Sequence, residues 1–152
     1  MMRSEGFIPP LEEAFGVDAV AAILVKTDGG TGGTESAKLV MDDLLAANPN
    51  AKTWAVTAIN HESIAGIIAA FEAAGRWSRD DIVLVGMGGG PLGQSQLRDG
   101  QIDGSVAFYP EKYGQWAVAA AVARMLGEPV PPYMYPDHVT LTMDNIDQFY
   151  PQ

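Results

Sequence analysis

The chain has no cysteine and is poor in basic residues and in histidine. Without cysteine it can form no disulfide, no thiolate nucleophile and no zinc site built on sulfur. Only 9 Lys and Arg stand against 19 Asp and Glu, and the net charge of -10 disfavours nucleic acid or an anionic membrane surface as a partner. Two histidines, His61 and His138, are too few to suggest a metal site. We expect no metal and no cofactor.

A long apolar run is also missing. No stretch reaches the ~18 apolar residues that a membrane-spanning helix needs. Residues 1–6 contain no apolar core of a signal peptide. We therefore expect a soluble chain that, as written, carries no export signal. Its 152 residues and 47% hydrophobic content suit one compact domain, residues 1–152.

What is present is an alternation of apolar runs and helical patterns. The run Ile82 to Val85 has no polar alternation and predicts a strand buried on both faces of a parallel sheet. Strands are predicted at 19–25, 53–59, 82–87, 105–108 and 138–141. Helices are predicted at 9–15, from Thr34 to 47, from Ser63 to 74, at 92–98, at 113–126 and as a turn at 144–149.

These elements predict a flavodoxin-like, three-layer α/β/α fold with a mostly parallel, twisted sheet. With the strands numbered along the chain, we expect the order 2-1-3-4-5. The last segment, residues 129–152, is rich in proline and tyrosine. We expect most of it to be extended and to leave the domain.

Four loops follow the carboxyl ends of the predicted strands, so they should meet at one edge of the sheet. They are residues 27–33, 60–63, 86–91 and 109–113. Their amides, hydroxyls and aromatic rings suit a neutral polyol. We expect Asn60, the amides of Gly88 and Gly89, and the loops at Asp28 and Tyr109 to line one cleft.

Each of these candidates also has a purely structural interpretation. Asn60 can hydrogen-bond a pair of sugar hydroxyls, or it can cap the helix that begins near Ser63, and the two roles are compatible. Tyr109 can stack on a sugar ring or simply pack at the rim. His61 fits a solvated loop residue better than a metal ligand.

Nucleotide binding and catalysis find little support. Gly86 and Gly88 have the first G-x-G spacing of a dinucleotide site, but the third glycine would fall at Pro91. The sequence contains no Gly-x-Ser-x-Gly motif, and no set of nucleophile, base and orienting group can be proposed at the shared edge. We expect a binding protein rather than an enzyme.

Several segments, taken in register, resemble one family. They are residues 51–54 with Asn60, Gly75, 80–82, 97–100, 127–130 and the Val-Thr-Leu-Thr tail at 139–145. Their order and spacing resemble the C-terminal lobe of type I periplasmic sugar-binding proteins of ABC transporters, and most of all the arabinose-binding type. The resemblance implies a two-lobed receptor that closes on a monosaccharide and delivers it to an ABC permease.

The resemblance also implies a place for this chain and roles for its residues. The chain would be one lobe of a periplasmic or extracytoplasmic protein, and residues 129–152 would cross to the N-terminal lobe. Arg3 and Asn60 fall where relatives hydrogen-bond the sugar. Two positions depart from the family: Gly88 replaces a second asparagine, and His61 replaces an acidic residue. The identity of the sugar therefore stays open.

Two other classes remain as alternatives. One is the effector lobe of a lactose-repressor-type regulator, and the other is a small nucleotide-dependent α/β enzyme. If the chain exists as an isolated lobe, its cleft face and tail would lack their normal cover. A homodimer through these surfaces is then plausible.

Overall fold

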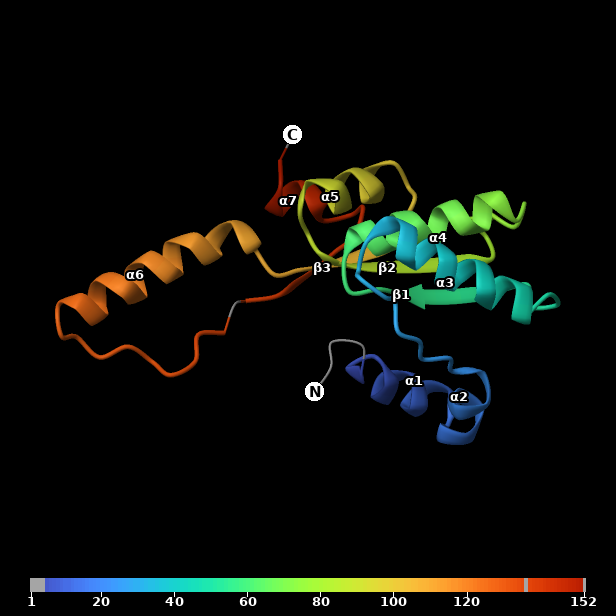
Figure 1. Ribbon diagram of the computed structural model, residues 1–152, viewed down its shortest axis with the longest axis horizontal. Helices are drawn as coiled ribbons and strands as arrows, with labels where there is room; N and C mark the ends of the chain where they lie inside the picture. The colour runs from blue at the N-terminus through green and yellow to red at the C-terminus, as the bar shows by residue number, and fades with distance from the viewer. Residues whose placement is uncertain (1–4, 136, 152) are drawn as a thin grey trace. The chain divides into compact units, whose positions relative to one another are not determined.

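The computed structural model describes residues 5–135 and 137–151 (Figure 1). The chain divides into two compact units, Met1–Leu84 and Val85–Gln152. A four-stranded sheet has the order β1 (Trp54–Thr57), β2 (Ile82–Gly88), β3 (Gly104–Ala107) and β4 (Val139–Leu141). This open, mostly parallel sheet with its helices is a flavodoxin-like α/β fold, as the sequence predicts. Within the described parts, no helix is both long enough and apolar enough to cross a membrane.

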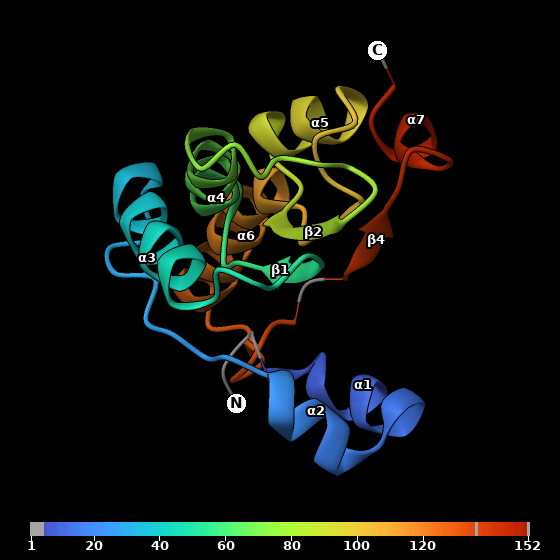
Figure 2. The ribbon, with the colours of Figure 1, turned by 90° about the vertical axis from the view of Figure 1, so that its right-hand side faces the viewer.

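The first unit is built around a pair of packed helices. Its elements are α1 (Ile8–Phe15), α2 (Val17–Ile23), α3 (Thr34–Ala47), β1 (Trp54–Thr57) and α4 (His61–Ala73). Helices α3 and α4 lie side by side (Figure 2). Their shared core contains Met41, Ile64 and Phe71, each at most 2% exposed. The Phe71 ring meets Trp54 of β1 edge to face, with centroids 5.8 Å apart.

Helices α3 and α4 lie very close together at Gly66. A Cβ atom at this position would lie 2.1 Å from the carbonyl oxygen of Thr34, which is too close for any side chain. The Thr34 hydroxyl in turn donates a hydrogen bond to the carbonyl of Glu62, 3.0 Å away. The absent side chain thus allows α3 and α4 to make backbone contact.

The strand predicted at Ala19–Val25 is wrong. Residues up to Ile23 form helix α2, and Leu24 and Val25 follow without regular structure. Alanine is the strongest helix former, and it occupies three of the seven positions of α2. A short apolar run does not by itself distinguish a strand from a helix. Because this segment is helical, β1 and β2 are neighbours in the sheet, and the predicted order 2-1-3-4-5 loses its strand 1.

The second unit holds most of the remaining sheet. Strand β2 (Ile82–Gly88) crosses the boundary between the units and pairs in parallel with β3 (Gly104–Ala107), from Val85 opposite Gly104 to Gly88 opposite Ala107. Strand β4 (Val139–Leu141) is antiparallel to β3. The other elements are α5 (Pro91–Arg98), the 3-10 turn η2 (Pro110–Lys112), α6 (Tyr113–Met125) and α7 (Ile146–Phe149).

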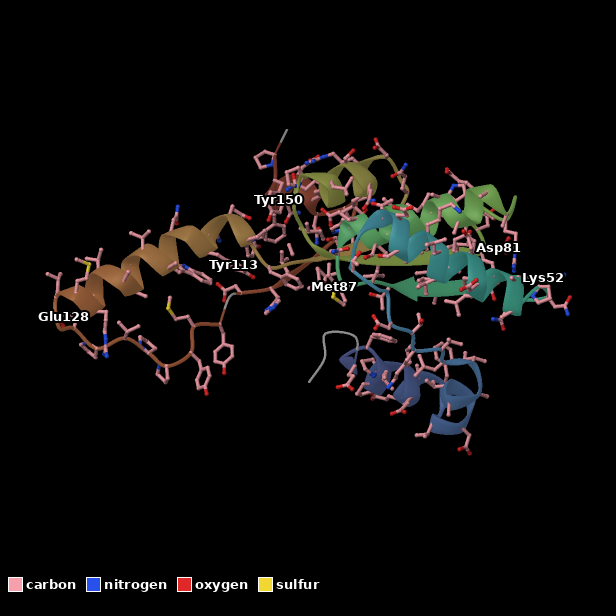
Figure 3. The ribbon with its side chains drawn as sticks, in the orientation of Figure 1. Lys52, Asp81, Met87, Tyr113, Glu128 and Tyr150 are labelled. Atoms are coloured by element: carbon pink, nitrogen blue, oxygen red, sulfur yellow. The ribbon has the colours of Figure 1, made fainter. Side chains whose placement is uncertain are left out.

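Helix α6, like the short helix α1, buries none of its residues. No residue from Tyr113 to Met125, all of which the structure describes, is buried. The residues that follow, 126–135, form neither helix nor strand, and that residues 129–152 leave the domain stays a prediction. Figure 3 shows the side chains of α6, which runs between the labelled residues Tyr113 and Glu128.

Candidate ligand-binding site

Asn60 joins β1 to α4 and caps the helix. Its backbone is extended, with φ -158° and ψ 173°, and its Oδ1 atom accepts a hydrogen bond from the backbone N–H of Ser63 at 2.8 Å. This satisfies one of the N–H groups that the first turn of a helix leaves without a partner. The capping role predicted for Asn60 is confirmed.

The same side chain also holds the glycine-rich loop. Asn60 Nδ2 donates to the carbonyl of Gly32 at 2.8 Å, and the Ser63 hydroxyl donates to the same carbonyl at 3.1 Å. Gly32 has φ 77°, a left-handed conformation that favours glycine. A Cβ atom there would approach Asn60 Nδ2 to 3.4 Å. Asn60 therefore connects the loop before α3 with the start of α4.

These bonds leave part of the amide available. A side-chain amide has two N–H donors and two acceptor lone pairs. Asn60 uses one donor on Gly32 and one lone pair on Ser63, and its side chain is half-buried rather than enclosed. Among the contacts of residues 5–135 and 137–151, these two bonds leave one donor and one lone pair, which is what a vicinal pair of hydroxyls requires.

Asp28 lies in the same loop and stays exposed. Its Oδ1 atom accepts from the backbone N–H of Gly30 at 3.0 Å, which makes an Asx turn. Further along, the Ser36 hydroxyl donates to the carbonyls of Gly29 and Gly33, at 3.2 and 3.0 Å. The loop is thus shaped by its own short polar side chains, with the Asp28 carboxylate on its outer side.

The prediction that His61 is a solvated loop residue is wrong. His61 is the first residue of α4 and only 4% of it is exposed. It shares one helix face with the buried Ile64, Ile68 and Phe71, at spacings of three, seven and ten residues. The helix begins two residues earlier than Ser63, and this earlier start places the ring on the buried face.

In the second unit, Gly88 ends strand β2 and Gly89 follows it, close to the backbone of Ala107. The φ angles of the two glycines are 128° and 74°. A Cβ atom on Gly89 would lie 2.5 Å from that of Ala107, so only glycine fits. The carbonyl of Gly88 accepts from the N–H of Phe108 at 3.3 Å, and the carbonyl of Gly89 accepts from Gln94 Nε2 at 2.9 Å.

Tyr109 follows β3 in a left-handed conformation, with φ 52° and ψ 56°. Its ring stacks on Tyr150, with centroids 6.3 Å apart and planes inclined by 25°. The ammonium of Lys112 lies over the Tyr109 ring, 4.0 Å from its centroid. The predicted packing role of this tyrosine is therefore real, and Tyr150, which the sequence did not single out, takes part in it.

The predicted site residues fall into two groups. In the first unit, Asn60 is bonded to the loop that carries Asp28 and is followed directly by His61. In the second, Gly88 is bonded to Phe108, the residue before Tyr109. Arg3 lies outside the described residues. That all of them line one cleft stays a prediction.

The glycine-rich loop at residues 27–33 follows α2 rather than a strand, whereas the glycines at 88–90 lie at the carboxyl end of β2. In an open α/β sheet, small ligands typically bind at that edge. Residues 1–129 match the family described as periplasmic binding protein domain. The chain belongs to this family.

Individual relatives are sugar-binding proteins. The ribose import binding protein RbsB of Escherichia coli is 34% identical over 91 residues, which are 60% of this chain and 29% of that protein. A periplasmic solute-binding protein of an ABC transporter from Actinobacillus succinogenes, solved with bound D-allose, is 25% identical, with a TM-score of 0.68 over 76% of this chain and 39% of its own.

An arabinose-binding relative shares the fold. The periplasmic component of the arabinose ABC transporter from Shewanella sp. ANA-3, solved with L-arabinofuranose, gives a TM-score of 0.69 at 24% identity over 92% of this chain and 48% of its own. The match to the ribose-binding relative spans less than a third of that protein's length. The predicted resemblance to the sugar-binding family is confirmed.

Proposed function

We propose that residues 1–152 form the C-terminal lobe of a solute-binding protein that binds a monosaccharide for uptake by an ABC transporter. The relatives that support this proposal bind ribose, D-allose and L-arabinofuranose. The parent protein would lie in the periplasm or outside the cytoplasmic membrane and would pass the sugar to a permease. The chain would bind without catalysing a reaction.

The observation that carries the proposal is the free half of the Asn60 amide. Its side chain is fixed by two bonds to backbone groups and still offers one donor and one lone pair. A fixed amide binds a hydroxyl pair without losing much conformational freedom, which favours affinity. Gly88 and Gly89 would add backbone amides, and Tyr109 an aromatic surface.

A single lobe should bind sugar weakly. A two-lobed receptor closes over its ligand and excludes water from the hydrogen bonds, whereas one lobe leaves half of the hydroxyls in solvent. We propose that α6 and residues 126–135 dock on the N-terminal lobe, because α6 buries none of its side chains in this chain. In its absence the same surface would support a homodimer, which light scattering would detect.

The test is an NMR titration of the isotope-labelled chain with ribose, arabinose, allose and glucose. We expect millimolar binding of at least one sugar, with shift changes at Asn60, His61, Gly88 and Gly89. Asn60→Asp keeps the acceptor that caps α4 but loses the amide donors. It should weaken binding about fivefold, the effect of one hydrogen bond.

Asn145→Asp is the matched control. Asn145 accepts from the backbone N–H of Thr142 and donates to the carbonyl of Thr140, both at 2.9 Å, so its bonding pattern is that of Asn60. The control should leave the sugar affinity unchanged. Shift changes that avoid Asn60 and the two glycines, or no binding of any sugar, would contradict the proposal. Submicromolar binding by the monomeric chain would contradict its assignment as half of a receptor.

A further inference from the structure

The backbone of Tyr109 has a left-handed conformation, which contacts with other residues must stabilise. Among residues 5–135 and 137–151, it is the only residue other than glycine with a positive φ. A left-handed backbone is unfavourable for a residue with a bulky side chain, so surrounding contacts must stabilise it. The backbone supplies one of them, since the Tyr109 carbonyl accepts from the N–H of Lys112 at 2.9 Å to begin the turn η2.

Further contacts come from Tyr150, which is 41 residues further along the chain, and from the nearby Lys112. Tyr150 stacks on the Tyr109 ring, and its hydroxyl donates to Glu111 Oε1 at 3.3 Å. Tyr150 thus contacts both the residue with the unusual backbone and the turn that follows it. The ammonium of Lys112 over the Tyr109 ring adds a cation–π contact.

Tyr150 is itself held in place independently of Tyr109. Its carbonyl accepts from the guanidinium of Arg98 on α5, which also pairs with Asp147 at 2.8 Å. Its backbone N–H donates to the carbonyl of Ile146 at 2.8 Å, and Ile146 is only 1% exposed. Tyr150 is therefore a fixed support rather than a loose terminal residue.

We propose that Tyr150 is a positioning residue that, together with Glu111, holds the Tyr109 side chain in the orientation in which it contacts a bound sugar. The inference rests on the proposed sugar-binding function, but its conformational part can be tested without sugar. Arg98, Lys112, Glu111 and Asp147 surround the tyrosine pair with two positive and two negative charges.

The protonation state of Tyr150 agrees with this role. Burial, then the charge of Glu111 and the hydrogen bond to it, and last the nearby Tyr109, raise the pKa of Tyr150 to about 12. The phenol is therefore protonated at neutral pH and acts as the donor to Glu111. Because the pKa is raised, the contact stabilises the fold below pH 10, and this stabilisation is lost as the pH rises towards 12.

The test compares Tyr150→Ala, Tyr150→Phe and Tyr135→Ala. The first removes the stacked ring, the second keeps the ring and loses the hydroxyl, and the third removes a tyrosine of the tail that is 82% exposed. The first readout, in the absence of sugar, is the set of backbone carbon chemical shifts of Tyr109, which report its φ and ψ. They should leave left-handed values in Tyr150→Ala and keep them in Tyr150→Phe and Tyr135→Ala.

The second readout is the sugar dissociation constant from the NMR titration. Tyr150→Ala should weaken binding about fivefold, the effect of one lost contact of ~1 kcal/mol, and Tyr150→Phe should restore most of it. Unchanged Tyr109 shifts in Tyr150→Ala, or an unchanged affinity despite altered shifts, would overturn the inference. If the unmodified chain binds no sugar, the proposed function fails, and the backbone shifts still decide whether Tyr150 holds Tyr109.

Discussion

Helices α4 and α6 have 13 residues each and differ completely in what covers them. Helix α4 buries eight of its residues, including Ile64 and Phe71, against α3 and its surroundings. Helix α6 buries none, and Val118, Val122 and Met125 are 64%, 48% and 85% exposed. The three exposed side chains recur at four and three residues, which is the spacing of an apolar stripe that packs on a partner.

Helices α4 and α6 show that two properties are independent: whether a segment is helical, and which surface covers its apolar side chains. Apolar periodicity predicts that α4 is helical, and the alanine content of α6 predicts the same. Neither says which surface covers the apolar stripe. In α4 the cover is a neighbouring helix of the same unit, whereas in α6 we propose a second lobe.

Hydrogen exchange should show the largest difference between the two helices. The amides of α4 should exchange only on global unfolding, which typically costs about 5–15 kcal/mol and slows exchange by many orders of magnitude. The amides of α6 should exchange with little protection, because an uncovered helix of this length is marginal in water. Equal protection of α4 and α6 in the isolated chain would show that α6 is covered after all.

Truncation of a large core side chain should have the next largest effect. Phe71→Ala should lower the free energy of unfolding by about 3–5 kcal/mol, because the side chain is fully buried and leaves a cavity. Met125→Ala on α6 is the counterpart and should change it by less than about 0.5 kcal/mol. Urea denaturation of both variants gives the comparison. A large loss for Met125→Ala would mean that α6 is packed in solution.

Replacing a glycine by alanine should lower stability in α4 and raise it in α6. Gly66→Ala places a Cβ 2.1 Å from the Thr34 carbonyl oxygen and should destabilise the fold by roughly 2–3 kcal/mol as α3 and α4 separate. Gly114→Ala, where nothing lies within 4 Å, should stabilise the helix by about 0.5–1 kcal/mol. Thermal unfolding measures both. A stable Gly66→Ala variant would refute the close contact between α3 and α4.

The smallest expected effect concerns the start of α4. Asn60→Ala removes the cap and the bond to Gly32 and should cost about 1–2 kcal/mol. Asn60→Asp retains the acceptor for the Ser63 N–H, so it should recover the capping part of this loss. Chemical denaturation of the two variants separates the cap from the loop contact. Equal losses in both variants would mean that the cap contributes nothing.

Most of the fold could be predicted from local sequence. The strands and helices from Thr34 onwards lie close to where local sequence places them, although α4 begins at His61 rather than at Ser63. Gly75, which has φ 65° just after α4, is an example of a correctly predicted end. The segment Ala19–Val25 failed because its apolar run is rich in alanine as well as valine, and local sequence gives no decision between strand and helix there.

The candidate site could be predicted only in part, because it depends on contacts between distant residues. The cap by Asn60 is local, since Ser63 is three residues away, and it could be inferred from residue type. The bond from Asn60 to Gly32 spans 28 residues, and the stack of Tyr109 on Tyr150 joins segments 41 residues apart in the sequence. No local sequence pattern predicts contacts between residues so far apart in the chain.

The two edges of the sheet have a consequence for solubility. The outermost strands are β1 with four residues and β4 with three, while β2, with seven, is interior. An edge strand offers unpaired N–H and C=O groups to other chains, and short edges offer few of them. Of the strands that the structure describes, the longest, β2, therefore has a neighbouring strand on each side, and its residues Val85 to Gly88 are paired with β3.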